Sequence, residues 1–86
     1  MEGPCLLSLE VVTSLSADQA SLRLKSFFLA EGLALVRENS DYMRFEGGGG
    51  FVEAGLCPDG DTLKLSIFTR EWEYQVKKFL SSLPLI

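Results

Sequence analysis

The sequence predicts an α+β fold, a two-layer sandwich in which an antiparallel sheet of about five strands carries two helices on one face. Residues 4–13 alternate between apolar and polar side chains, which is the pattern of a half-buried strand. After a first helical segment, four more strand-like segments follow one another at hairpin spacing. An amphipathic segment closes the chain, so the expected order is β-α-β-β-β-β-α.

The first strand and the first helix have clear local signals. Alternation places the apolar side chains of the strand on one side, namely Cys5, Leu7, Leu9 and Val11. The helix is expected to begin after Ser16, because a serine N-cap followed three residues later by Gln19 forms a capping box. It should end near Glu31, since Gly32 suits the left-handed position that closes a helix. Its core stripe is predicted to comprise Ala17, Ala20, Leu24, Phe27 and Phe28.

Two leucines of this helix do not fit the core stripe. Leu22 and Leu29 are two turns apart and project nearly opposite to it. Single exposed leucines are common. Two that are stacked on an otherwise polar face form a small apolar ridge, which favours contact with a partner.

The strands of the second half are predicted at residues 33–38, 42–46, 51–57 and 62–68. Asn39 and Asp41 favour a turn before the second of them, and Gly60 can adopt positive φ before the last. The final helix is predicted to start from Thr69 as N-cap and to stop at Pro84. Its apolar stripe comprises Trp72, Val76, Phe79, Leu80 and Leu83.

Four consecutive glycines, Gly47 to Gly50, resemble a phosphate-binding loop at first sight. Such a loop leads into a helix, and the Walker type needs Lys and Ser or Thr after its last glycine. Here Phe51 and Val52 follow and read as a strand, so the run is predicted to be a hairpin turn. Geometry alone should leave two of the four replaceable, and a mobile lid is the alternative interpretation.

Length and charge restrict the class of protein. The 86 residues form one domain, residues 1–86, in which we expect disorder at the first four and last three positions. A net charge of −4 with scattered basic residues argues against nucleic-acid binding. No segment is apolar enough to cross a membrane or to act as a signal peptide. We therefore expect a cytoplasmic protein in which Cys5 and Cys57 are small buried thiols.

Catalysis is not expected. The chain has no histidine, which removes the commonest general base and the usual nucleophile pairs. Asp59 and Asp61 lack the further ligands of a calcium loop, so we predict neither a metal nor a cofactor. Carboxylates remain, and an enzyme would need Asp41, Glu46 or Glu53 to converge.

The uncovered face of the sheet is the most informative surface. If the strands lie in the order first, fifth, fourth, third, then Glu10, Lys64, Glu53 and Arg44 should form a row of alternating charge, with Glu46 on the same face. That face also receives several apolar side chains, which are Leu6, Val12, Tyr42, Phe51 and Phe68. A charge row of both signs could suit a twofold contact between two copies.

The residues carry no family motif, but the order of elements resembles two known architectures. One is the single repeat of TATA-binding-protein-like domains, which implies a curved sheet whose open face meets nucleic acid. The other is a shortened START-like helix-grip fold, which implies an apolar cleft between the sheet and the last helix, roofed by Trp72 and Phe79. The acidic balance of the chain argues against the first use.

Three functions are compatible with the sequence. The first is a non-catalytic interaction module, homodimeric through the open sheet face or through the Leu22 and Leu29 ridge. The second is a protein that binds a small apolar ligand near Trp72, with the glycine hairpin as its lid. The third is a small carboxylate-dependent enzyme. The residues most relevant to an interface or a ligand are Leu22, Leu29, Tyr42, Phe51, Phe68 and Trp72.

Overall fold

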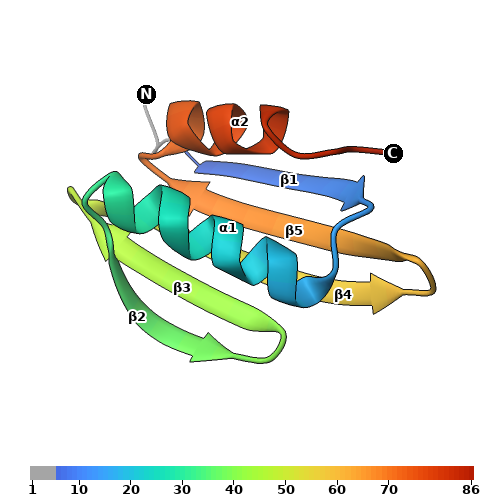
Figure 1. Ribbon diagram of the computed structural model, residues 1–86. Helices are drawn as coiled ribbons and strands as arrows, with labels where there is room; N and C mark the ends of the chain where they lie inside the picture. Colours follow the sequence, from blue (N-terminus) through green and yellow to red (C-terminus); the bar gives the residue numbers. More distant parts are fainter. Residues whose placement is uncertain (1–5) are drawn as a thin grey trace.

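The computed structural model describes residues 6–86 and has the predicted element order (Figure 1). The strands are β1 (Leu6–Thr13), β2 (Ala34–Asn39), β3 (Tyr42–Gly47), β4 (Gly50–Asp59) and β5 (Thr62–Arg70), and the helices are α1 (Ala17–Ala30) and α2 (Glu73–Ser81). All strand pairings are antiparallel. The prediction of an α+β sandwich is therefore confirmed.

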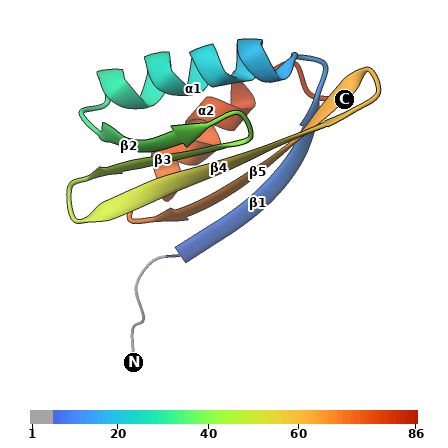
Figure 2. The same cartoon turned by 90° about the horizontal axis from the view of Figure 1, so that it is seen from below.

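The sheet has the order β1-β5-β4-β3-β2. Strands β2 to β5 form a meander joined by short turns, and β1 pairs with β5 at the far side of the sheet. Both helices lie on the same side of the sheet, and no part of residues 6–86 covers its other side (Figure 2). In Figure 1, α2 lies along the β1 side and α1 crosses toward β3 and β2.

The core fills the layer between the helices and the sheet. Phe28 of α1 is fully buried and lies between Phe45 of β3 and Phe79 of α2, with ring centroids 5.5 Å away in both cases. The inward positions of β5, predicted from its alternation, are all buried, namely Leu63, Leu65 and Ile67. Burying large aromatic rings from three elements supplies much of the stability of so small a domain.

Helix α1 begins and ends as its sequence predicts. The Ser16 hydroxyl accepts from the backbone N–H of Gln19 at 3.1 Å, and the Gln19 side chain accepts from the backbone N–H of Ser16 at 2.9 Å. The helix closes at Gly32, whose φ is +99°. Lys25 of α1 forms a 2.5 Å ion pair with Glu38 of β2, which ties the helix to the edge strand below it.

The glycine run is a hairpin turn, as predicted, but the structure strongly constrains three of its four glycines. Gly48 and Gly49 form the two-residue turn with φ of +58° and +82°, the combination that type I′ hairpins require. At Gly50 a Cβ atom would lie 2.0 Å from the carbonyl oxygen of Arg70. Gly47 is also tight, with a Cβ position 3.3 Å from the Leu33 Cα. The expectation that two of the four are replaceable on geometry alone is therefore wrong.

The start of α2 also differs from the prediction. Thr69 is not its N-cap, because β5 continues to Arg70 and the helix begins at Glu73 with Trp72 as N-cap. Thr69 is instead a buried strand residue whose hydroxyl donates to the backbone oxygen of Phe51 at 2.7 Å. The chain turns from β5 into α2 at Glu71, which has a positive φ of 72°. The helix ends at Ser81, three residues before Pro84.

The last residues pair with the outer edge of β1, contrary to the expected disorder, while the same expectation for the first four residues concerns positions outside the described part of the chain. Leu85 forms an antiparallel bridge with Thr13, and the N–H of Ile86 donates to the Val12 oxygen at 3.0 Å. The buried Thr13 hydroxyl donates to the Pro84 oxygen at 2.8 Å. This contact covers part of an edge strand, whose unpaired backbone would otherwise be open to other chains.

Candidate functional site

The face of the sheet opposite the helices carries the apolar side chains that the sequence placed there. Leu6 is 52% exposed, Val12 38% and Phe68 39%, while Tyr42 and Phe51 are half-buried. The rings of Phe51 and Phe68 lie beside each other with centroids 5.4 Å apart. Nothing in the described chain covers this face (Figure 2). We refer to it below as the open face.

Arg44 is the electrostatic centre of the open face. Its guanidinium donates to Glu46 through Nε at 2.7 Å and to Glu53 through Nη1, and it lies 4.3 Å above the Phe51 ring. The hydrogen bonds to Glu46 and Glu53 raise the pKa of Arg44 further above its already high value. Partial burial opposes this shift but is outweighed. Two acids and one base are thereby held in a fixed arrangement over an aromatic ring.

The predicted row of alternating charges is correct only in part. The strand order is the expected one, and Glu53 does lie opposite Arg44. Glu10, however, pairs in register with Ser66, and its carboxylate accepts from the Ser66 hydroxyl at 3.3 Å. Lys64 is one step further along and lies opposite Val12 and Cys57. The predicted row is wrong at Glu10 and Lys64 because the registers of β1 and β4 against β5 decide which residues lie opposite each other, and strand alternation alone does not reveal a register.

Gly55 creates a hollow in the middle of the open face that sequence reasoning missed. The hollow has a volume of about 220 Å³ and is walled by Tyr42, Phe68, Ser8 and Ser66. A Cβ atom on Gly55 would come no closer than 3.9 Å to any neighbour, so the glycine is not required by packing. The available sequence signal was Gly55 itself, because a glycine inside a strand has no side chain to fill the space on its face of the sheet.

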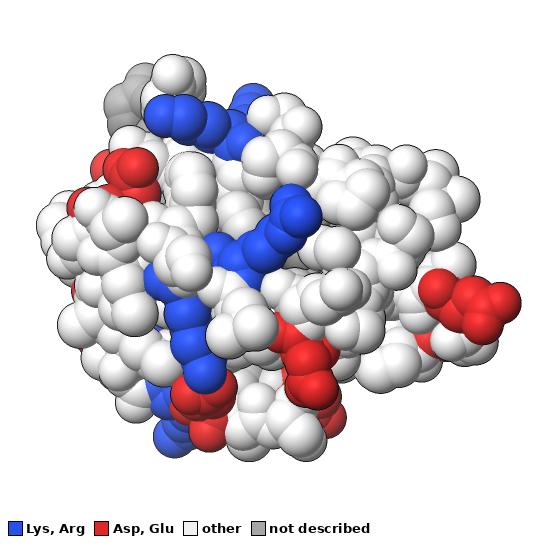
Figure 3. Space-filling model, viewed as in Figure 1, with Lys and Arg blue, Asp and Glu red and all other residues white. Residues whose placement is uncertain are grey.

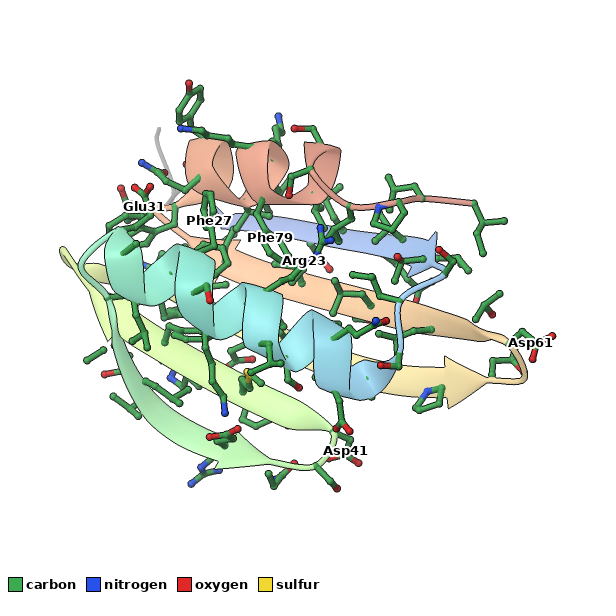
Figure 4. All side chains as sticks on the ribbon, in the orientation of Figure 1. Arg23, Phe27, Glu31, Asp41, Asp61 and Phe79 are labelled. Atoms are coloured by element: carbon green, nitrogen blue, oxygen red, sulfur yellow. The ribbon has the colours of Figure 1, made fainter. Side chains whose placement is uncertain are left out.

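A second concave feature lies between the two helices. It is a groove of about 390 Å³ lined by Leu22, Arg23, Ser26, Phe27, Ala30, Glu31, Phe79 and Ser82. In Figure 4, Phe27 and Phe79 lie between the helices, with Arg23 toward one end and Glu31 toward the other. Arg23 also donates to the backbone oxygen of Ser82 at 3.3 Å, which places a cation at the negative end of the α2 dipole.

The groove is not where the sequence placed an apolar cleft. The space between the sheet and α2 is filled by Val76, Phe79, Leu80 and Leu83, all of which are buried. Trp72 does not line the groove. Its indole N–H donates to the Gly47 oxygen at 2.9 Å, and its ring packs against Gly48. Trp72 thus holds the glycine hairpin in place.

The two leucines of the predicted ridge are exposed, Leu22 by 64% and Leu29 by 47%. Leu22 forms part of the rim of the groove between the helices, whereas Leu29 is outside it. The structure therefore associates Leu22 with a concave feature and leaves Leu29 on the outer surface of α1.

The carboxylates considered for catalysis occupy two places. Glu46 and Glu53 converge on Arg44, and Asp41 lies in the β2–β3 turn (Figure 4). Cys57 is exposed on the open face, so the expectation that it is buried is wrong, while Cys5 lies outside the described residues. The alternation of β4 explains this, because Val52, Ala54 and Leu56 face the core and the next residue must face outward.

On the side covered by the helices, charged side chains are scattered among uncharged areas, and in places a basic side chain lies directly against an acidic one (Figure 3). Within residues 6–86, neither helix has the length and apolar character that crossing a membrane requires. Neither a protein-family model nor a curated protein matches this sequence. The open face and the groove between the helices are therefore the features of the described chain that bear on its function.

Proposed function

We propose that this protein is a non-catalytic interaction module that forms a homodimer by packing the open faces of two copies together. The observation that carries the proposal is the apolar content of an uncovered sheet face, above all the adjacent Phe51 and Phe68 rings. A contiguous apolar patch of this kind on a small domain is typical of a protein contact surface. An exposed thiol such as Cys57 is compatible with a reducing compartment, and we propose the cytosol.

The dimensions of the open face fit a modest dimer. The sheet has five strands spaced about 4.8 Å apart, and the six steps from Leu6 to Val12 advance about 3.3 Å each. The face therefore measures about 24 Å by 20 Å. Two such faces would bury roughly 1,000 Å² in total, near the lower limit for a specific interface. We therefore expect an association in the micromolar range rather than a permanent dimer.

Chemical features of the same face support binding over catalysis. Glu46 and Glu53 lie on this face, and both form ion pairs with Arg44. A general acid or base must be able to exchange its proton with a substrate. Charge-assisted contacts with a permanent cation instead hold both carboxylates in fixed positions.

Light scattering and sedimentation velocity across the micromolar range test the proposal. The expected result is a mass that rises from the 9.5 kDa of one chain toward twice that value. Phe68→Ser should shift this transition to at least about tenfold higher concentration, because a central aromatic contact is lost. Tyr74→Ser is the matched control, since Tyr74 is an exposed aromatic residue on α2, away from the sheet. A single-chain mass at every concentration would refute the proposal.

The groove between the helices supports a second candidate function, the binding of a small apolar ligand. Its volume of about 390 Å³ is within the range of ligand sites, and Phe27 and Phe79 give it an aromatic lining. Titration with anilinonaphthalene sulfonate, which fluoresces in apolar sites, tests it. Ala30→Trp should remove the fluorescence increase by filling the groove, whereas Lys77→Trp, on the exposed side of α2, should not. An increase that survives Ala30→Trp but is lost in Phe68→Ser would assign the dye to the open face instead.

A further inference from the structure

The strand register of the open face points to one arrangement of the dimer, and we propose that its twofold axis runs along β4. This inference rests on the proposed function, because it names how the second copy is placed on the open face. Charged and aromatic side chains of adjacent strands lie in rows across the open face. One row across the sheet reads Leu6, Arg70, Phe51, Glu46 and Ala34, from β1 to β2.

A twofold axis along β4 exchanges β5 of one copy with β3 of the other. In the row just described, β4 contributes the central residue, Phe51. Arg70 of each copy would therefore face Glu46 of the second copy, and the two Phe51 rings would meet at the axis. The symmetry produces this acid–base contact twice, as a self-complementary interface requires.

The next row reinforces the arrangement. It runs Ser8, Phe68, Glu53, Arg44 and Arg37. The same axis places Phe68 of one copy opposite Arg44 of the other, an arrangement suited to a cation–π contact. Glu53 would face its own counterpart, and here the ion pair with Arg44 matters, because it neutralises each carboxylate within its own chain.

Other axes bring like charges together. An axis across the strands, through the middle of the face, places Arg70 of one copy opposite Lys64 of the other, since these residues lie toward opposite ends of β5. An axis along β5 places the two Arg70 side chains opposite each other. Like charges brought together at an interface are strongly unfavourable. An axis along β4 also keeps the strands of the two sheets nearly aligned, which is the usual packing of two twisted sheets.

Charge exchange between two variants tests the arrangement. Arg70→Glu and Glu46→Arg should each weaken self-association by at least about tenfold, because each places two like-charge pairs across the axis. An equimolar mixture should recover the complex as a heterodimer, with both contacts again between acid and base. Native mass spectrometry distinguishes the heterodimer from either homodimer. Since the natural chain carries −4, a change of two units leaves both variants negative, and net attraction cannot explain their association.

Lys64→Glu is the matched control. It makes the same charge change on the same strand, but in this arrangement Lys64 faces no charged residue of the second copy. It should leave self-association within about twofold of the natural protein. Melting temperatures of all variants, measured at low concentration, establish that each one folds.

Two results would overturn the inference, and they are distinguishable. If the natural protein dimerises and Phe68→Ser weakens the dimer, but the mixture of the two charge variants recovers nothing, the axis is wrong and the open face remains the interface. If the natural protein is a monomer at all concentrations, the proposed function fails and the arrangement fails with it.

Discussion

The glycine hairpin offers the sharpest test of how this fold is held together, because its four glycines face four different constraints. We consider alanine at each position in turn. Gly50 is the most constrained, since its Cβ atom would lie 2.0 Å from the Arg70 oxygen and 2.7 Å from the Glu71 Cβ. The end of β5 would have to move away from β4 to accept it. Inserting one carbon into a packed site costs typically about 1–3 kcal/mol and occasionally more, and a backbone obstacle places Gly50→Ala at or above about 3 kcal/mol.

The other three positions should cost less and in a defined order. Gly49 has positive φ but open space around its Cβ position, so Gly49→Ala should lose about 1–2 kcal/mol for the left-handed backbone alone. Gly48→Ala should lose somewhat more, because its Cβ would also lie 3.0 Å from the Trp72 ring. Gly47→Ala should change the free energy of unfolding by less than about 1 kcal/mol. Alanine lowers the conformational entropy of the unfolded chain, and this gain offsets the tight contact with Leu33.

Urea unfolding monitored by Trp72 fluorescence measures these free energies by linear extrapolation. All variants should be compared at one low protein concentration, because dimerisation would add to the apparent stability. A domain of this length has a total stability of roughly 4–13 kcal/mol, so Gly50→Ala should remove a large fraction of it. If Gly50→Ala unfolds at the same urea concentration as Gly49→Ala, then Arg70 and Glu71 do not approach β4 closely at this position.

Two further predictions concern the core and the chain end. Phe79→Ala should lower the free energy of unfolding by about 3–5 kcal/mol, because the ring is buried against Phe27 and Phe28. Thermal melting measures this loss. A loss below about 1 kcal/mol would mean that the site collapses around the smaller side chain. Thr13→Val should cost about 1 kcal/mol by removing the hydrogen bond to the Pro84 oxygen. Hydrogen exchange of the Ile86 amide should then become much faster while that of the central strands is unchanged. Protection of Ile86 that survives the substitution would show that the tail is held without Thr13.

Much of the fold could be predicted from local signals because those signals act over a few residues. The capping box of Ser16 and Gln19, the left-handed Gly32 and the alternation of β5 each depend only on near neighbours, and the structure contains all three. The open face followed from the same alternation, once both helices were assigned to one side. These predictions are correct because local preference and overall fold agree.

The errors arose where two local signals competed or where distant strands set the geometry. Thr69 and Glu71 look like a helix start, yet the alternation that buries Ile67 also buries Thr69, and burial decided the outcome. The charge row across the sheet depended on the register of strands distant in sequence, which no local pattern contains. The groove between α1 and α2 depends on how the two helices pack side by side on the sheet, whereas the pattern of each helix predicts only its own apolar stripe.

The pairing of β1 with β5 has a consequence for how the chain is made. Leu6 pairs with Arg70, and at a synthesis rate of about 5–20 residues per second roughly 3–13 s separate their appearance. During that interval α1 and the earlier hairpins can form, while the apolar side of β1 has no sheet partner. Chaperones that recognise nascent chains have their opportunity in those seconds. Translational pauses between the codons for the two strands would prolong it, so the yield of folded protein should depend on the speed of the ribosome over this stretch.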